Sequence, residues 1–388
     1  MHSSNVSTHG MAVAPHHLAS QSALAILREG GSAIEAMVAA AAAIAVVYPH
    51  MNGLGGDGFW LIVPPEGDPI AIDASGAAGS LATLEAYAGQ RHIPHRGPQA
   101  ALTVAGTVSG WDEALRISRD LTGRALPVAR LLADADDAQT VHRIVEATKR
   151  AFALRDAHIT DPRHLDVDVQ QLLTPEALQP LADSIDDASA SPWGGGKGPG
   201  DTVWMGVVDN SGLAVSFIQS IYHEFGSGVV LPDTGIVWQN RGAAFSLDPQ
   251  HLLALAPGKQ PFHTLNPAAA RLNDGRVMVY GSMGGDGQPQ TQAALFTRYI
   301  LQGVPLQESI SRPRWLLGRT WGQSSDSLKL EGRFAPACIA RLRELGHDVE
   351  VLADFSEAMG HAGAIVRHPN GLLEGATDPR SNGAAAGY

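Results

Sequence analysis

The sequence predicts an α+β protein in which layers of helices pack around antiparallel sheets. Residues 20–50 hold two helical patterns on either side of a Gly30–Gly31 pair, and the second is alanine-rich and apolar nearly all round. Residues 202–221 contain two apolar strand patterns joined by DNSG, which is typical of a hairpin. Further strand patterns and one helix pattern follow toward the C-terminus.

Each remaining element follows from its local pattern. A glycine-rich turn leads into a strand within 51–63, and residues 69–76 supply a second strand. A turn precedes a helix within 101–121, and residues 140–159 form an amphipathic helix. Strands are also expected in 235–242, 276–285, 347–355 and 361–383, with a helix over 290–303.

Bulk composition excludes several functional classes. The 388-residue chain is 44% hydrophobic, which is enough for a sizeable core. Its formal charge of −12 argues against a nucleic-acid partner, because phosphate binding needs a basic face. The longest apolar run, residues 36–48, is shorter than the roughly 20 residues of a membrane span, and the N-terminus has no signal-peptide pattern. We therefore expect a cytoplasmic protein with neither a membrane nor a nucleic-acid partner.

Cysteine and histidine usage predicts no metal site and no cofactor. The one cysteine, Cys338, can form no internal disulfide and lies in a helical pattern, so we expect it in the core. The sixteen histidines are scattered and include no HExxH motif. GxSxG is also absent, which disfavours a hydrolase of the nucleophile-elbow type.

Two glycine-rich segments allow structural and functional interpretations. GLGGDGF at 53–59 lacks the Lys-Ser/Thr of a P-loop and the spacing of a dinucleotide fingerprint, which favours a structural turn. GSMGGDG at 281–287 lies between a predicted strand and helix. Its glycines either satisfy a tight turn or direct backbone N–H groups at a developing oxyanion.

Thr202 starts a strand directly after the run GGGKGPGD. A threonine with a free α-amino group carries its own base, because that amine titrates at about 7.7–8.0 and can accept the hydroxyl proton. Such an enzyme must be cut immediately before the threonine, and an open loop suits self-cleavage there. The alternative is an ordinary loop followed by a strand that begins with a β-favouring residue.

Five blocks cover most of the chain: residues 30–63, 103–115, 202–230, 258–270 and 280–295. In sequence and in order they resemble the γ-glutamyltransferase family. This resemblance implies an N-terminal-nucleophile hydrolase with a four-layer αββα sandwich, made as a precursor that cleaves itself before a threonine.

Carried over by position, the resemblance also implies the catalytic residues. The nucleophile falls on Thr202, and the cleavage site lies between Asp201 and Thr202. The glycines of the oxyanion hole fall on Gly284 and Gly285. The hydroxyl that steadies the N-terminal threonine falls on Ser220, where the family has threonine.

Cleavage at this site would give a large part, residues 1–201, and a small part, residues 202–388, which together form one αββα domain. The family's large part is longer after ALPVARLLADA, so we expect a segment to be missing near residues 133–137. Assembly into a higher oligomer is compatible with the sequence.

The positions that bind a γ-glutamyl group depart from the family. Ser75 stands where an arginine holds the substrate α-carboxylate, and Ala244 where an aspartate holds the α-amino group. Tyr222 replaces an asparagine near the nucleophile, and His263 and Thr264 replace a serine pair. The catalytic groups are therefore kept while the glutamyl-binding groups are lost.

Arg241 adds a cation where the family has a neutral amide residue. A guanidinium group can bind a carboxylate through two hydrogen bonds, so Arg241 is the expected ligand of the substrate carboxylate. The alternative is a structural salt bridge, in which case His263 and Arg96 are the next candidates. Tyr222 and Thr264 are expected to line the same substrate site.

This pattern of retained and lost groups resembles the oxamate-hydrolysing branch of the family. It predicts an amidohydrolase that acts on a small anionic amide and converts oxamate to oxalate and ammonia. Two alternatives stay open: a γ-glutamyl hydrolase or transferase acting on glutathione, and a catalytically silent binding protein.

Overall fold

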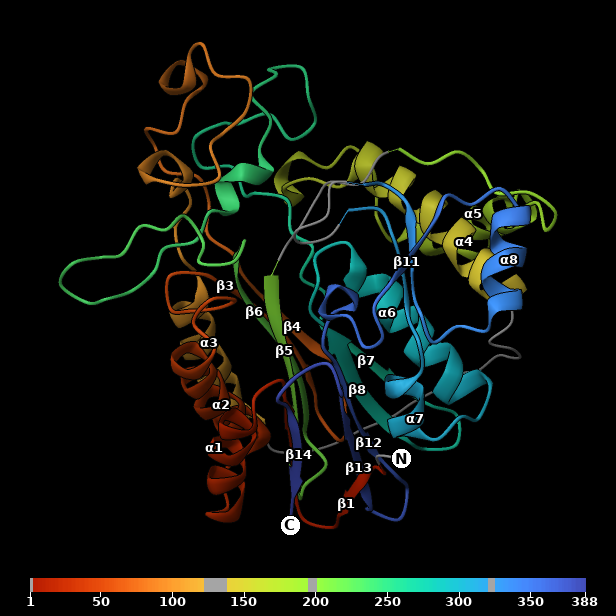
Figure 1. The fold of residues 1–388 in the computed structure, drawn as a ribbon. Coiled ribbons are helices and arrows are strands. Elements are labelled where there is room, and N and C mark those ends of the chain that lie inside the picture. The colour runs from red at the N-terminus through yellow and green to blue at the C-terminus, as the bar shows by residue number, and fades with distance from the viewer. Residues whose placement is uncertain (1–2, 122–137, 195–200, 320–324) are drawn as a thin grey trace.

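The computed structural model describes residues 3–121, 138–194, 201–319 and 325–388. Two sheets face each other between two layers of helices, which confirms the expected αββα sandwich (Figure 1). The predictions about residues 133–137 and about most of the glycine-rich run before Asp201 lie outside the described residues.

The first sheet is antiparallel, with strand order β14-β2-β5-β6-β3-β4. Three helices from the N-terminal third cover its outer face. The strands are β2 (Met11–Ala14), β3 (Asp57–Val63), β4 (Ile70–Ala74), β5 (Asp201–Val208), β6 (Ala214–Tyr222) and β14 (Ala384–Gly387), and the helices are α1 (His17–Arg28), α2 (Ala33–Val47) and α3 (Thr107–Asp120).

The second sheet has the order β1-β13-β12-β8-β7 and is also antiparallel. Helices that follow β8 pack on its outer face through an apolar core. The strands are β1 (Asn5–Ser7), β7 (Ala268–Arg271), β8 (Val277–Ser282), β12 (Ala362–Arg367) and β13 (Leu373–Thr377), and the helices are α6 (Gly287–Phe296), continued by a π-turn over Thr297–Leu301, and α7 (Leu306–Ser311).

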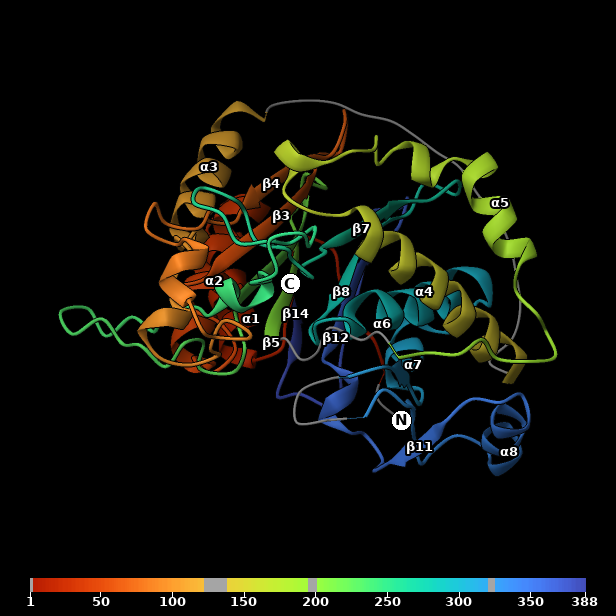
Figure 2. The same ribbon diagram turned by 90° about the horizontal axis from the view of Figure 1, so that it is seen from above.

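A smaller unit lies beside the sandwich, as the view from above shows (Figure 2). Its three-stranded sheet, ordered β11-β10-β9, shares an apolar core with α4 and α8. The strands are β9 (Trp315–Leu317), β10 (Leu328–Glu331) and β11 (Val349–Leu352), and the helices are α4 (Ala138–His158), α5 (Pro175–Asp183) and α8 (Pro336–Glu344). Short 3₁₀ turns occupy Leu84–Tyr87, Pro98–Ala100, Pro162–His164, Gln171–Leu173, Arg241–Ala244 and Glu357–Met359.

The central strand β5 is buried on both faces because side chains alternate along a strand. Val203, Met205 and Val207 pack against the helices of the first layer, whereas Trp204 and Val208 face the second sheet. Burial on both faces explains why the sequence of this strand is almost continuously apolar.

The predicted pair of N-terminal helices is confirmed. Ser32 caps α2: its side chain accepts the N–H of Glu35, and the Glu35 carboxylate accepts the N–H of Ser32. The apolar run of residues 36–48 therefore forms a helix of the sandwich. No helix within the described ranges is both long enough and apolar enough to cross a membrane.

Two local expectations need correction. Residues 235–242 form no strand: Val237 and Trp238 make isolated bridges, and Arg241 begins a 3₁₀ turn, because the backbone changes partner from one residue to the next. Trp238 N–H donates to Val229 and Gln239 N–H donates to Gly55. Cys338 is only half-buried, at the edge of the core shared by α8 and the small sheet.

Candidate active site

Thr202 lies at the start of the central strand with a buried side chain, 1% exposed. β5 and β6 pair at Asp201↔Tyr222 and next at Val203↔Gln219, so β6 carries one extra residue between these pairs. Ser220 in β6 therefore falls within a bulge opposite Thr202, a device that redirects side chains beside active sites. The structure thus brings together the predicted nucleophile and its predicted hydroxyl partner.

Ser220 is held firmly in this bulge. Its side chain is 1% exposed, and its Oγ accepts the backbone N–H of Tyr222 at 2.8 Å. Tyr222 has a φ of 77°, an uncommon backbone conformation for a non-glycine residue. A Cβ on Gly56 would lie 2.1 Å from the Ser220 carbonyl oxygen, so the GLGGDGF segment must pack its backbone against the bulge. The glycines of that segment therefore form a structural turn, as expected.

Trp204 fixes β5, the strand that begins with Thr202, against β8, the strand that leads into the glycine turn. A Cβ on Gly281 would lie 2.1 Å from Trp204 Cδ1, so only glycine allows β5 and β8 to approach this closely. Trp204 Nε1 donates to Ser216 Oγ at 2.9 Å, which fixes the indole. β8 then runs directly into residues 283–286.

Gly284 and Gly285 lie in the turn between β8 and α6, where a strand-to-helix connection was expected. Their φ values of 116° and 52° are in the region that favours glycine. The turn is closed by a hydrogen bond of 2.8 Å from Gly287 N–H to the Gly284 carbonyl. The partial positive charge at the start of α6 favours an anion beside this turn.

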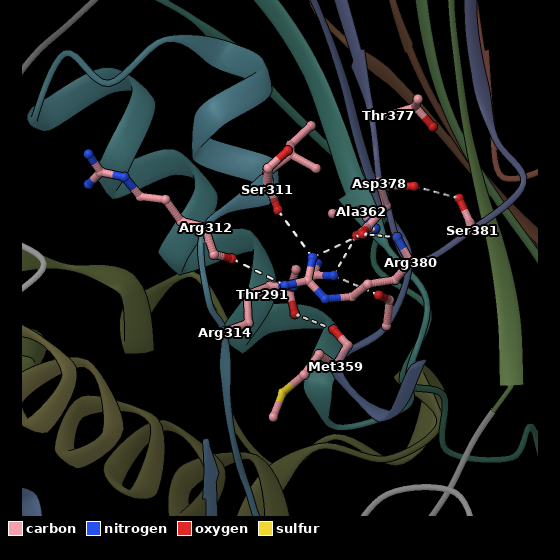
Figure 3. A network of polar contacts seen from close by, with 12 residues as sticks. Thr291, Ser311, Arg312, Arg314, Met359, Ala362, Thr377, Asp378, Arg380 and Ser381 are labelled. Carbon is pink, nitrogen blue, oxygen red and sulfur yellow. Dashed lines mark hydrogen bonds and ion pairs between the residues drawn. The ribbon is translucent and has the colours of Figure 1, made fainter. Parts of the chain in front are cut away.

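A buried ion-pair network lies behind the glycine turn (Figure 3). Arg314 and Arg380 both bind the carboxylate of Asp378. Arg314 Nη2 also donates to the Gly360 carbonyl at 2.7 Å, and a Cβ on Gly284 would lie 3.8 Å from Gly360 Cα. The network thus supports the chain segment against which the turn packs.

Arg380 is fully bonded within this network. Its Nε and Nη2 donate to the two carboxylate oxygens of Glu331 at 2.7 and 2.5 Å, and its Nη1 donates to Asp378 at 3.0 Å. Burial alone would raise the pKa of Asp378, but the charges of Arg314 and Arg380 hold that pKa below its usual value. Burial lowers the pKa of Arg314 to about 10, so it remains charged near neutral pH.

A pocket of about 200 Å³ opens beside the glycine turn. Three residues predicted from the sequence line it: Tyr222, Thr264 and Gly285. Thr264 Oγ1 is buried and has no hydrogen-bond partner among the described residues. Ala244 also lines the pocket, so the wall is apolar where the family carries an aspartate.

Arg241 lies behind the pocket wall, at the start of a 3₁₀ turn. Its side chain is 1% exposed, and its guanidinium carbon lies 3.8 Å from the centre of the Tyr222 ring. Within the described part of the chain, neither Nε nor Nη1 has a hydrogen-bond partner. Burial lowers the pKa of Arg241, while Tyr222 and Asp57 oppose this effect. A buried cation with unused donors is costly unless a ligand satisfies it.

Asp57 is a site residue that the sequence reasoning missed. Its Oδ1 accepts the N–H groups of Gly76 and Gly106, each at 3.2 Å, and its Oδ2 lies 3.3 Å from His263 Nε2. Burial and the charge of Arg241 lower the pKa of His263, and Asp57 opposes this shift. Asp57 lies inside GLGGDGF, so an acid in a tight turn was the available signal.

The remaining predicted positions have other partners. Ser75 Oγ accepts a hydrogen bond from Gln260 Nε2 at 3.2 Å. Arg96 Nη1 donates to the Gly226 carbonyl, so this nitrogen already has an acceptor. Asp201 pairs with Tyr222 at the first position of the hairpin.

One group of side chains in the described ranges has the spacing of a metal site: His142, Glu146 and His347. Its atoms already have partners. His142 Nδ1 and His347 Nε2 share a hydrogen bond of 2.8 Å, and Glu146 binds Lys149 at 2.7 Å and Arg150 at 2.9 Å. Because a metal ion would have to displace two cations from Glu146, we interpret the cluster as structural.

These features define a class of protein. An αββα sandwich with a buried threonine at the start of a central strand is the architecture of N-terminal-nucleophile hydrolases. Cephalosporin acylase from Bacillus halodurans has the same fold, with a TM-score of 0.79 and 24% identity over 100% of this chain and 97% of that one.

Sequence comparison identifies the family. The pattern of the gamma-glutamyltranspeptidase family matches residues 19–135 and 129–388, so the chain belongs to this family. Oxamate amidohydrolase proenzyme from Klebsiella pneumoniae subsp. pneumoniae is 73% identical, over 100% of both chains. Glutathione hydrolase-like YwrD proenzyme from Bacillus subtilis is 34% identical, also over 100% of both chains.

Proposed function

We propose that this protein is a self-processing amidohydrolase that uses Thr202 as its nucleophile and converts oxamate to oxalate and ammonia. The observation that carries the proposal is Arg241, a buried cation with unused donors against a wall of a small pocket that also includes Gly285. A pocket of about 200 Å³ suits a small acid amide, and the 73% identity to an oxamate amidohydrolase proenzyme supports this substrate.

Processing would make the catalytic base. Thr202 Oγ attacks the Asp201 carbonyl carbon, and the bond from that carbon to the Thr202 nitrogen breaks, which leaves an ester. Water hydrolyses the ester, so that residue 201 ends in a carboxylate and residue 202 begins with a free amine. That amine titrates near neutral pH and can accept the Oγ proton.

Turnover would repeat the same chemistry on the substrate. The Thr202 amine takes the Oγ proton, Oγ attacks the amide carbon of oxamate, and the N–H groups of Gly284 and Gly285 hold the oxyanion. The amine returns its proton to the leaving nitrogen, which departs as ammonia. A water molecule, deprotonated by the same amine, then hydrolyses the oxalyl ester and releases oxalate.

Charge and hydroxyl groups would select the substrate. Arg241 would bind the carboxylate next to the scissile amide, beside the ring of Tyr222. Tyr222 and Thr264 line the pocket. Asp57 lies 3.3 Å from His263 and would keep that ring near Arg241. Ser220 would steady Thr202 from the bulge in β6. Ser75 and Ala244 offer no charge for the amino-acid head group of glutathione, which disfavours the γ-glutamyl alternative.

We further propose that cleavage gives a large part, residues 1–201, and a small part, residues 202–388. The alignment with the Klebsiella relative runs over 528 positions, whereas this chain has 388 residues. The two ranges that match the family pattern also overlap, at residues 129–135. Both facts support a missing segment near residues 133–137.

Intact mass and ammonia release test the proposal together. The unmutated protein should yield two chains, the second starting at Thr202, and should release ammonia from oxamate faster than it hydrolyses glutathione. Thr202→Ser should also be cut, and Thr202→Ala should stay a single inactive chain. A Thr202→Ala protein that still splits at this bond, or an unmutated protein that prefers glutathione, would overturn the proposal. An uncut and inactive unmutated protein would favour the silent binding protein.

A further inference from the structure

Asp286 places a carboxylate in the pocket that is proposed to bind an anionic amide. It follows Gly285 directly, its side chain is 3% exposed, and it lines the same pocket as Tyr222 and Thr264. An uncompensated negative charge there would repel both a substrate carboxylate and a developing oxyanion, because charges interact strongly at partly buried sites. The proposed chemistry therefore requires a cation beside Asp286.

Arg155, near the end of α4, supplies that cation. Its Nη1 lies 2.7 Å from Asp286 Oδ1, and its Nε donates to Asp156 Oδ1 at 2.8 Å. The guanidinium carbon lies 4.0 Å from the centre of the Phe152 ring and 5.3 Å from that of Phe262. Two acids and two aromatic rings therefore hold this side chain in one position.

The Arg155 side chain is charged, and its Nη2 can still donate hydrogen bonds. Burial alone would lower the pKa of Arg155, but the charges of Asp286 and Asp156 outweigh burial and raise that pKa. Arg155 Nη2 is buried and has no hydrogen-bond partner within residues 3–121, 138–194, 201–319 and 325–388. Phe262, which contacts Arg155, also lines the pocket.

We propose that Arg155 is a positioning residue that neutralises Asp286 and thereby lets the pocket accept small carboxylates. The inference rests on the proposed function, because it concerns the acid group of that substrate. Residue 155 precedes the proposed cleavage site and residue 286 follows it, so the pair would join the two processed chains. A pair that merely ties α4 to α6 would affect charged and neutral substrates equally.

The test separates charge from structure. KM and kcat are measured for oxamate and for oxamide, its neutral diamide of similar size, together with the dissociation constant of oxalate. The proteins are the unmutated enzyme, R155Q, R155K, D286N and R155Q/D286N. R116Q is the matched control, because it breaks an exposed ion pair with Glu113 on α3.

R155Q should raise the oxamate KM and the oxalate dissociation constant by about 10- to 100-fold, the effect of removing one positive charge near the ligand, and change oxamide less than about threefold. R155K and R155Q/D286N should return the oxalate dissociation constant to within about threefold of the unmutated value. R116Q should match the unmutated enzyme. If R155Q does not accumulate, D286N decides the question: it should bind oxalate at least as tightly as the unmutated protein.

Equal losses on oxamate and oxamide, or no recovery in R155Q/D286N, would overturn the inference, as would weaker oxalate binding in D286N. The proposed function fails separately, if the unmutated enzyme leaves oxamate intact. In that case oxalate binding that still depends on Arg155 supports the inference, and loss of oxalate binding in every protein overturns it.

Discussion

Arg380 and Arg241 are both fully buried arginines near the glycine turn, yet their surroundings differ. Every guanidinium nitrogen of Arg380 donates to Glu331 or Asp378. Arg241 Nε and Nη1 have no partner among the described residues, and the contact with Tyr222 is to the face of its ring. Arg314 also has two nitrogens without partners among the described residues, but its Nη2 binds the Asp378 carboxylate. Since a buried charge is costly without a counter-charge, a carboxylate partner indicates a structural role for Arg314 and Arg380, and its absence from the hydrogen bonds of Arg241 indicates a binding role.

The largest expected effect comes from breaking the buried ion-pair network around Arg380. Asp378→Asn leaves two buried guanidinium groups without their shared charge, so the free energy of unfolding should fall by about 3–5 kcal/mol. Chemical denaturation measures this change. Arg116→Gln, at an exposed ion pair, should cost less than about 1 kcal/mol. Comparable losses in the two variants would show that the buried network carries no special stability.

The buried cluster of His142, Glu146 and His347 should make the free energy of unfolding depend on pH. Burial, together with the charges of Lys149 and His142, lowers the pKa of His347 to about 4 in the folded protein. The unfolded chain binds this proton at about 6.5, so the unfolding free energy should fall by about 1–3 kcal/mol as the pH drops from 6.5 to 4. The group contributes no pH dependence above that window.

His347→Gln should flatten this part of the stability profile, since glutamine does not titrate. His164→Gln, at an exposed histidine on a 3₁₀ turn, is the control and should leave the profile unchanged. An unchanged slope in His347→Gln would contradict the lowered pKa of His347 in the folded protein.

Replacing Arg241 should change the free energy of unfolding by a smaller amount and in the opposite direction. Arg241→Met removes a buried charge whose Nε and Nη1 have no hydrogen-bond partner among the described residues, and Asp57 keeps its backbone donors from Gly76 and Gly106. The free energy of unfolding should stay the same or rise by about 1 kcal/mol in the absence of ligand. A loss as large as that of Asp378→Asn would mean that Arg241 supports the fold.

Metal removal should have the smallest effect. The one metal-like cluster in the described ranges has its donor atoms bonded to each other and to cations, and the proposed mechanism uses an amine as base. Dialysis against EDTA should therefore leave ammonia release from oxamate unchanged. Full loss of activity that a single metal restores would contradict this account.

The sequence predicted elements whose patterns are local. The apolar hairpin of β5 and β6, the alanine-rich helix α2 and the strand-to-helix turn at Gly284 each follow from neighbouring residues, and the predictions held. Residues 235–242 were misassigned because their backbone partners are divided between the nearby Val229–Val230 and the distant Gly55. The edge strands β1 and β14 are only three and four residues long, too short for a recognisable pattern.

The candidate site likewise contains residues that the sequence could identify and residues that it could not. Motif positions such as Thr202, Ser220 and Gly285 could be named from resemblance, because they lie in continuous blocks. Asp57 and Asp286 could not be given their roles, because these depend on contacts with residues far away in sequence. Asp57 accepts hydrogen bonds from Gly76 and Gly106, and Asp286 meets Arg155 across 131 residues.

The most direct test of the central claim compares oxamate and oxamide turnover in Arg241→Gln and in the unmutated enzyme, with self-cleavage measured on the same samples. The account predicts that cleavage before Thr202 is intact, that kcat/KM for oxamate falls by about 2–3 kcal/mol in free-energy terms, and that oxamide changes much less. Equal losses on both amides would contradict it, because Arg241 would then support the fold and the carboxylate would have to be bound by another residue.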